Sequence, residues 1–490
     1  MSSDLKDKAV KGVAWSLVER FGIQLMNFII GIILARLLLP EDYGQLGMIL
    51  IFYFVAEAFI QGGLGEAYVQ KKEVSDTDAN TVFFSNLGIS ALTYLLLWFA
   101  APAISRFYDQ PILTDLTRAL SVVLIINAFN IIQQAQIKRA LNFKRKTRIT
   151  LIAALASGII AVAAAYKGYG VWSLIIQRLT NSFILTAGLW ITSHWKPRFS
   201  FSRQSFSDMF SFGAWILAAS VIRSIFDNIY KVVIGKLFPV AELGYYTKAK
   251  TFQQIGSQQL TQSVSSVSMP VFSRMQDNKP RLRNAMATFS RHTAVFIMPI
   301  MVLVIVLAKP FVIILLTDKW APMIPYLQLL CIVGFLYPMH AVNIQVLLAQ
   351  GKSNLNFNLG MIKNVLRIIN IAVMYRWGIT WIIIGEAVLS VISLSINTYY
   401  TKRLIGYGLM QQLKDLKYIL MISILSGILT YLIFFSVENL WIFFLGGAFC
   451  FGLLTITLHY ILNRKYVNEI MDLVKNLTHG NSKTGNNKND

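Results

Sequence analysis

Apolar runs that alternate with short charged segments make up most of this chain. A helix needs about 20 predominantly apolar residues to cross a bilayer, and many of these runs reach that length. The pattern therefore predicts about fourteen membrane-spanning helices, of which 243–272 is the most polar, and 309–323 is a further candidate for partial embedding. The predicted crossings are 12–38, 44–68, 81–104, 113–136, 148–166, 170–193, 209–237, 243–272, 287–308, 323–349, 355–375, 378–401, 417–436 and 439–462.

Lysine and arginine are concentrated in every second loop between these helices. If the N-terminus is cytoplasmic, the inner loops hold the basic residues at 6–11, 71–72, 138–148, 196–203, 274–283, 352 and 402–417, and those of the tail from 464. The outer loops hold only Arg106, Lys167, Lys309, Lys319 and Arg376. Because basic loops stay on the cytoplasmic side, we predict fourteen helices with both termini in the cytoplasm.

Part of the N-terminal half recurs about 200 positions later. Ala14-Trp15 returns as Ala214-Trp215, Gly44 returns as Gly244, and Leu141-Asn142-Phe143 returns as Leu355-Asn356-Phe357. The offset spans six helices, an even number, so the two copies are predicted to be parallel repeats about an axis along the membrane normal. The expected parts are an N-lobe of helices 1–6 (1–200), a C-lobe of helices 7–12 (201–405), helices 13 and 14 (406–465) and a disordered cytoplasmic tail (466–490).

Composition agrees with a membrane protein and argues against several other classes. The 490 residues are 55% hydrophobic and 14% charged, with a formal net charge of +22. This excess lies mostly in short loops, where it sets topology, and no basic module interleaved with aromatic residues points to nucleic acid. The two cysteines, Cys331 and Cys450, lie in apolar runs and make neither a disulfide framework nor a metal site.

Charged residues nevertheless occur inside the apolar run at 211–236. Arg223, Asp227 and Lys231 are spaced at i, i+4 and i+8, so they share one helix face. A charge at the bilayer centre costs at least about 2.5 kcal/mol, so this stripe is expected to face a bundle interior or a wet cavity. Two interpretations remain open: an internal salt-bridge ladder that holds the bundle together, and a pathway lining for an anionic substrate.

Further charges lie inside other predicted helices, mainly in the first two helices of each copy. We predict a cationic cavity between the copies, which suits a substrate that carries phosphate or carboxylate groups. The acidic residues near it would balance charge or couple ions. The predicted substrate-binding cations are Arg223, Lys231, Lys248, Lys250, Arg20 and Arg367, and the predicted acidic residues are Asp227, Glu57 and Glu19.

Signals for enzyme chemistry are weak. Asp76-Thr77-Asp78 matches the D-x-D of many glycosyltransferases, but it immediately precedes a helix, where aspartate is a common N-cap. The five histidines are dispersed, no Walker sequence is present, and no predicted loop exceeds roughly 20 residues. We therefore expect no catalytic residue, no metal and no cofactor, and a protein that is not an enzyme.

Four motifs carry a resemblance to a known family: ARLLLPEDYGQLGM (35–48), IQGGLGEAYVQKK (60–72), QAQIKRALNFKRKTR (134–148) and YGVWSLIIQRL (169–179). They resemble the polysaccharide-transporter branch of the multidrug/oligosaccharidyl-lipid/polysaccharide (MOP) exporter superfamily. Within it the chain is similar to Wzx-type flippases of the colanic-acid and teichuronic-acid exporter type. The resemblance covers about residues 8–465.

This resemblance implies an all-α integral membrane fold, with two six-helix lobes that form a V, two extra C-terminal helices and alternating access. It also implies flipping of undecaprenyl-diphosphate-linked oligosaccharide repeat units, which the cationic cavity suggests are acidic, across the bacterial cytoplasmic (inner) membrane. The implied partners are the lipid-linked oligosaccharide, membrane lipids and the polysaccharide polymerase machinery. Lipid II flippases and multidrug (MATE) exporters share the fold and remain alternatives, as does a membrane enzyme of the same pathway.

Overall fold

The computed structural model describes residues 3–61 and 63–464, and every regular element within these ranges is a helix. The tail predicted at 466–490 lies outside the described residues. The chain divides into two compact units, Met1–Lys248 and Ala249–Asp490, which we call unit 1 and unit 2. The division falls inside a helix, α10 (Val240–Ser273).

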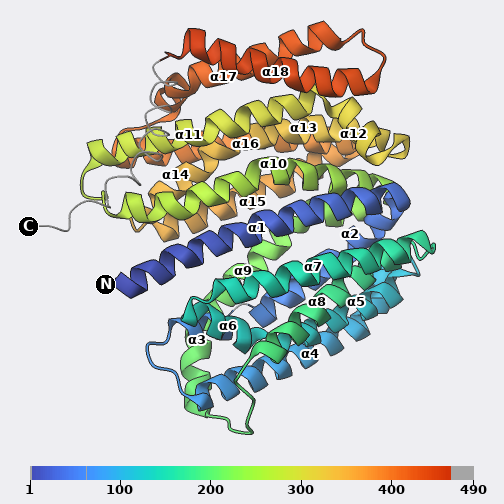
Figure 1. The fold of residues 1–490 in the computed structure, drawn as a ribbon, viewed down its shortest axis with the longest axis vertical. Helices are drawn as coiled ribbons and strands as arrows, with labels where there is room; N and C mark the ends of the chain where they lie inside the picture. Colours follow the sequence, from blue (N-terminus) through green and yellow to red (C-terminus); the bar gives the residue numbers. More distant parts are fainter. Residues whose placement is uncertain (1–2, 62, 465–490) are drawn as a thin grey trace, which may run out of the picture. The chain divides into compact units, whose positions relative to one another are not determined.

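In its described residues, 3–61 and 63–248, unit 1 has nine helices and the first turns of α10 (Figure 1). Its helices are α1 (Ser3–Leu37), α2 (Pro40–Gln61), α3 (Leu64–Gln70), α4 (Asp76–Tyr108), α5 (Leu113–Ala128), α6 (Ile131–Ala140), α7 (Phe143–Tyr166), α8 (Trp172–Thr192) and α9 (Arg203–Leu237).

Up to residue 464, unit 2 contains the rest of α10, eight further α-helices and two 3₁₀ turns. These are α11 (Lys279–Val306), α12 (Ala308–Leu316), η1 (Asp318–Met323), α13 (Ile324–Phe335), α14 (Tyr337–Ala349), α15 (Ser353–Met374), η2 (Tyr375–Trp377), α16 (Ile379–Ile405), α17 (Leu409–Phe434) and α18 (Leu440–Leu462).

The helices confirm an all-α integral membrane protein. Among the described residues, 11 helical segments are long and apolar enough to cross a membrane, or up to 13 if each of two bent helix pairs is one span. The remaining predicted crossing, 243–272, lies in α10. Its polar residues make it less apolar than these segments. With 34 residues, α10 is still long enough to cross the roughly 30 Å hydrocarbon layer.

A break between α5 and α6 bends the predicted crossing 113–136 by 44°. Such a bend frees backbone carbonyls that must find other donors inside a membrane. Helix α8 supplies them, because Thr186 Oγ1 donates to the carbonyl of Ile126 (3.2 Å) and Trp190 Nε1 donates to that of Phe129 (2.9 Å). At the break itself, the buried Asn130 donates to Thr186 Oγ1 (2.6 Å). The direction of α6 is therefore set by bonds to α8.

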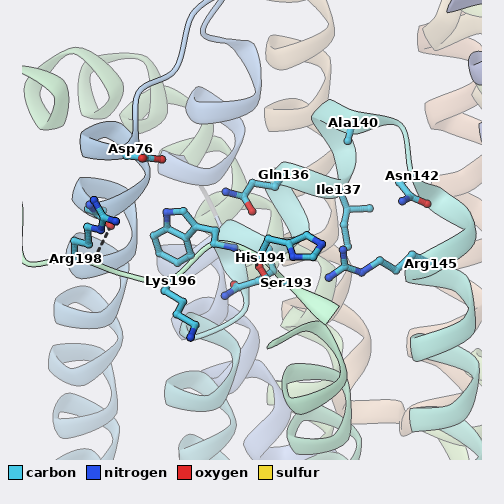
Figure 2. A pocket seen from close by; sticks show the side chains of 13 residues that line it. Asp76, Gln136, Ile137, Ala140, Asn142, Arg145, Ser193, His194, Lys196 and Arg198 are labelled. Carbon is cyan, nitrogen blue, oxygen red and sulfur yellow. Dashed lines mark hydrogen bonds between the residues drawn. The ribbon is translucent and has the colours of Figure 1, made fainter. Parts of the chain in front are cut away.

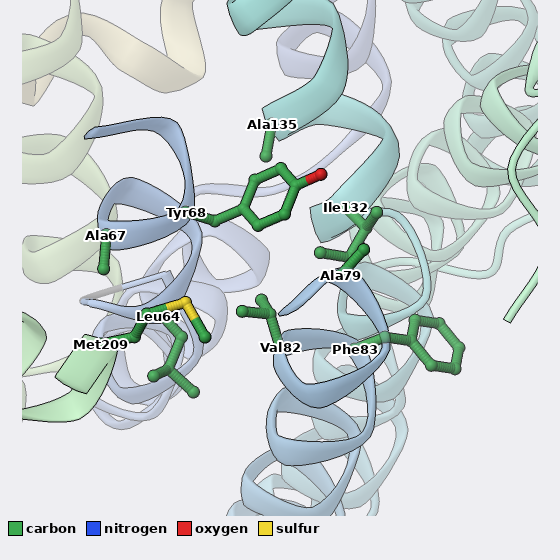
Figure 3. Packing of buried hydrophobic residues seen from close by; sticks show 9 residues of the cluster. All are labelled: Leu64, Ala67, Tyr68, Ala79, Val82, Phe83, Ile132, Ala135 and Met209. Carbon is green, nitrogen blue, oxygen red and sulfur yellow. The ribbon is translucent and has the colours of Figure 1, made fainter. Parts of the chain in front are cut away.

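A buried apolar cluster holds α3, α4, α6 and α9 together at one end of unit 1 (Figure 3). Val82 of α4 and Ile132 of α6 are completely buried in it. Tyr68 of α3 and Met209 of α9 belong to the same cluster, and Trp190 and Trp195 pack against it. Burying such side chains stabilises the fold by about 1.5–3 kcal/mol each, so the cluster fixes the positions of these helix ends.

The two copies of the repeat meet within unit 1 at a pair of glycines. A Cβ atom at Gly44 of α2 would collide with the carbonyl oxygen of Val240, and a Cβ at Gly244 of α10 would collide with that of Pro40. Pro40 and Val240 are themselves 200 positions apart, as are the two glycines. The contact is thus reciprocal between equivalent positions, which only residues without a side chain permit at this distance.

Unit 2 is held together by a buried polar network as well as by apolar packing. The Asn343 and Gln412 amides exchange two hydrogen bonds (2.9 and 3.0 Å), and Thr401 Oγ1 donates to Asn343 Oδ1 (2.8 Å). These bonds join α14, α16 and α17 around completely buried side chains such as Met339 and Met298. In the connection from α16 to α17, burial and the hydrogen bond to Asp415 raise the pKa of Tyr407.

We expect Gly244→Val to destabilise the protein by about 1–3 kcal/mol or more, because the new side chain must displace the backbone of Pro40. Thermal unfolding of the purified protein in detergent measures this. Gly88→Val is the control, since a Cβ at Gly88 of α4 meets nothing within 4 Å. Equal melting temperatures for the two variants would contradict the glycine contact.

Candidate functional site

The predicted stripe on α9 is largely accessible. Arg223 and Asp227 are exposed, and Lys231 is half-buried. Lys231 Nζ donates to Asn228 Oδ1 at 3.0 Å, and Asn228 in turn donates to the carbonyl of Ser224 at 2.9 Å. The exposed guanidinium of Arg223 can therefore contact a ligand without first leaving a buried position.

Lys248 is a buried cation that binds α1. It exposes only 5% of its surface, and its Nζ donates to the carbonyl of Gly31 at 2.8 Å. The same atom lies 4.6 Å from the centre of the Tyr43 ring, within the range of a cation–π interaction. A carbonyl and an aromatic face thus compensate part of its desolvation, and they hold α1, α2 and α10 together.

Glu19 and its neighbour Arg20 have different surroundings. Glu19 is buried, and its carboxylate lies 3.1 Å from Lys146 Nζ of α7. Thr147, next to Lys146, donates to the carbonyl of Trp15 at 3.1 Å, which strengthens the same α1–α7 contact. Arg20 is exposed. The structure therefore places Glu19 in a helix-joining ion pair and leaves Arg20 accessible.

Glu57 lies in a polar network that crosses three helices of unit 1. Tyr53 Oη donates to Glu57 Oε1 at 3.1 Å, and Asn127 of α5 is 3.5 Å from Tyr53 Oη. Ser182 of α8 donates to Asn127. Arg178, also on α8, interacts electrostatically with Tyr53 and Glu57. Sequence reasoning missed Arg178, although a charge inside the apolar run 170–193 is itself a signal.

The two predicted cations of unit 2 also contact protein groups. Lys250 Nζ lies 2.5 Å from Glu386 Oε1 of α16, and the two side chains are 19% and 15% exposed. Arg367 donates to Asn364 Oδ1 at 3.2 Å on its own helix, α15. Glu386 was not predicted, although it is an acidic residue inside the apolar run 378–401.

Beside Arg367, Lys363 begins a chain of partly buried hydrogen bonds. Its Nζ donates to Asn397 Oδ1 at 2.6 Å, and Asn397 Nδ2 is 3.2 Å from His340 Nδ1. His340 Nε2 is 3.2 Å from Ser390 Oγ. This chain joins α15, α16 and α14, so Lys363 acts within the packing of unit 2.

Several polar residues of α10 bond along their own helix. Gln253, Ser257 and Thr261 are each at most 3% exposed. Gln253 Nε2 donates to Ser257 Oγ at 2.7 Å, and Thr261 Oγ1 donates to the Ser257 carbonyl at 2.7 Å. These bonds satisfy within the helix part of the polarity that makes 243–272 the most polar of the predicted crossings.

The D-x-D sequence has a structural role at the start of α4. Ser75, not an aspartate, is the N-cap, and its Oγ accepts from the backbone N–H of Asp78 at 3.1 Å while Asp78 accepts from the Ser75 N–H at 2.9 Å. Asp78 also binds Lys71 Nζ at 2.8 Å. This capping box accounts for Asp78 and leaves Asp76 in the first turn.

Sequence comparisons relate the chain to proteins of surface polysaccharide synthesis. A family model described as "Polysaccharide biosynthesis protein" matches residues 33–325. The succinoglycan biosynthesis transport protein ExoT of Rhizobium meliloti is 27% identical over 323 residues, which are 66% of this chain and 65%, just under two thirds, of ExoT. The lipopolysaccharide biosynthesis protein WzxC of Escherichia coli is 24% identical over 364 residues, 74% of each chain.

Comparison with solved structures identifies the fold. The lipid II flippase MurJ, in an inward closed conformation, superposes with a TM-score of 0.77 at 16% identity, covering 94% of this chain and 100% of that one. The chain therefore shares the fold of this membrane flippase.

We predict that Lys250 and Glu386 stabilise unit 2 as a pair. Lys250→Ala and Glu386→Ala should each lower the free energy of unfolding, because either change alone leaves a half-buried charge without its partner. The loss in the double variant should be about 1–3 kcal/mol smaller than the sum of the two single losses. Unfolding of the purified variants in detergent measures this. Lys352→Ala is the control, since Lys352 is an exposed lysine. Its effect on the free energy of unfolding should add to that of Glu386→Ala.

Proposed function

The chain belongs to the polysaccharide biosynthesis protein family, and from that premise we propose that it flips lipid-linked oligosaccharide repeat units across the bacterial cytoplasmic membrane for surface polysaccharide synthesis. The units would enter from the cytoplasmic leaflet and leave to the outer one. There the polymerase machinery would join them.

The observation that carries this proposal is the presence of cations inside membrane helices together with the family match. Lys231, Lys248 and Lys250 lie within α9 and α10 rather than at their ends. Intramembrane charges are expensive and mark substrate or ion pathways. The names of ExoT and WzxC describe transport or biosynthesis of polysaccharides and support a role in polysaccharide transport.

The chemistry of the cations favours a substrate with phosphate or carboxylate groups. A diphosphate-linked lipid carries such a group next to its saccharide, and uronic acids would add more. We propose that the exposed Arg223 and Arg20 meet this charge first, because both are accessible. Lys231, Lys248, Lys250 and Arg367 would support them. Arginine suits the role, since its planar fork binds phosphate and carboxylate oxygens in pairs.

The acidic residues have distinct places in this proposal. Glu19 and Glu57 already have protein partners in Lys146 and Tyr53. Asp227 lies exposed one turn from Arg223 and would balance its charge or couple an ion to transport. Movement would follow alternating access, in which one repeat rocks against the other.

A flipping assay tests the proposal directly. Purified protein is reconstituted into liposomes with an undecaprenyl-diphosphate-linked acidic oligosaccharide, and the fraction reaching the opposite leaflet is measured with a membrane-impermeant glycosidase. We expect Arg223→Ala to lower the rate about tenfold or more, because it removes a charge-assisted contact worth about 1.5–3 kcal/mol. Its thermal stability should change little, since Arg223 is exposed.

Arg203→Ala is the matched control, an exposed arginine at the first residue of the same helix, α9, and it should retain the wild-type rate. Equal losses of flipping and of stability in Arg223→Ala would instead make the α9 stripe part of the scaffold. No flipping by the wild-type protein would contradict the function itself.

A further inference from the structure

Unit 1 contains a polar pocket that has no part in the function proposed above. Its volume is about 570 Å³, and it lies where four segments end or begin (Figure 2). The walls come from the first turns of α4 and α7, from α6, and from the segment 193–198 that follows α8. These segments adjoin loops whose basic residues are expected on the cytoplasmic side.

Cations outnumber acids in this pocket. Arg145, Lys196 and Arg198 line it, against the single carboxylate of Asp76. Figure 2 shows Arg145 reaching from α7 toward His194. None of the three cations forms an ion pair with any residue in the described ranges. The Nε of Arg145 is buried without a hydrogen-bond partner among these residues. Its Nη2 makes a long hydrogen bond (3.5 Å) to the carbonyl of Leu189, so the pocket offers to an anion positive charge that no carboxylate of the described residues pairs.

A buried amide gives a second and independent indication of a ligand. Gln133 of α6 lines the pocket and exposes only 1% of its surface. Neither its nitrogen nor its oxygen has a hydrogen-bond partner in the part of the chain that the structure describes. A buried polar group left unpaired costs about 1–3 kcal/mol, so this amide is suited to a ligand that both donates and accepts hydrogen bonds.

The walls of the pocket are held rigidly. Asn80 of α4 donates to Ser200 Oγ at 2.8 Å and accepts from the backbone N–H of Arg198 at 3.1 Å. The N–H of Ser202 is 3.1 Å from Thr81 Oγ1. These bonds fasten the segment 193–202 to α4, and the bonds from α8 at the α5–α6 bend fix the helix that carries Gln133. A ligand would therefore meet preformed walls.

Apolar side chains beside the pocket indicate that the ligand comes from the membrane. Phe199 stacks on Phe84 with ring centres 5.2 Å apart but remains 99% exposed, and Phe201 is 59% exposed. Ile191, in the last turn of α8, is 84% exposed. The pocket lies at the ends of the spans α4, α7 and α8, so these side chains are at the depth where headgroups meet acyl chains.

We propose that this pocket binds the phosphate-bearing headgroup of an anionic membrane lipid in the cytoplasmic leaflet. Arg145 binds the phosphate, Lys196 and Arg198 add positive charge along the wall formed by the segment 193–198, and Gln133 with Asp76 bonds to headgroup hydroxyls. The exposed phenylalanines contact the start of the acyl chains. A lipid with phosphate and hydroxyl groups, such as phosphatidylglycerol, fits these donors and acceptors, whereas zwitterionic phosphatidylcholine lacks both the net charge and the hydroxyls.

Native mass spectrometry of the full-length protein with defined lipids tests this proposal. Phosphatidylglycerol should bind at least about tenfold more tightly than phosphatidylcholine, a difference of about 1.4 kcal/mol. The double variant Lys196→Gln/Arg198→Gln should remove most of this preference. Its fold should persist, because both side chains are exposed. The control Lys72→Gln/Arg203→Gln removes the same charge from exposed positions of unit 1 outside the pocket and should keep the preference.

Gln133→Leu provides a second variant that separates binding from folding. Replacing an unpaired buried amide by an apolar side chain of similar size should not lower the melting temperature, but it should weaken phosphatidylglycerol binding. Equal losses in the Lys72/Arg203 control would mean that surface charge alone attracts the lipid, and the proposal would fall. Displacement of the lipid by glycerol phosphate at similar concentration would assign the pocket to a soluble anion and also overturn it.

Discussion

Polar groups inside a membrane protein must find their partners within the protein, and most features of this structure follow from that constraint. Lys248 reaches a backbone carbonyl and an aromatic ring, Glu19 pairs with a lysine of another helix, and Lys250 pairs with Glu386. The bend between α5 and α6 persists because α8 satisfies the freed carbonyls. Each of these contacts also joins two or more helices, so the charged side chains contribute to helix packing.

The repeat in the sequence has a physical counterpart at the start of α2 and α10. Gly44 and Gly244, 200 positions apart, each lie against a carbonyl of the other copy. A duplicated unit that meets itself must present the same surface twice, and a glycine at this position lets both backbones approach. The contact therefore joins the start of α2 to the start of α10 through equivalent positions of the repeat.

The helices and the family could be predicted from the sequence because apolar length, loop charge and motifs are local properties. Contacts between residues far apart in the sequence could not be predicted in this way. Arg178 and Glu386 lie inside apolar runs, where their charge alone was a signal, but the assignment of Ser75 as N-cap in place of an aspartate depends on loop geometry. The pocket around Gln133 depends on the bend between α5 and α6 and on loop contacts. Neither produces a periodic pattern in the sequence. The roles of Arg223 and of the other predicted cations in substrate binding remain predictions.

The most direct test of a flippase function is the state of the lipid-linked oligosaccharide in cells that lack this gene. The account predicts that complete repeat units, linked to the lipid carrier, accumulate on the cytoplasmic leaflet while surface polymer disappears, and that the wild-type gene reverses both effects. If the lipid-linked unit were absent altogether, the protein would be needed to build the unit rather than to move it, and the central claim would be wrong.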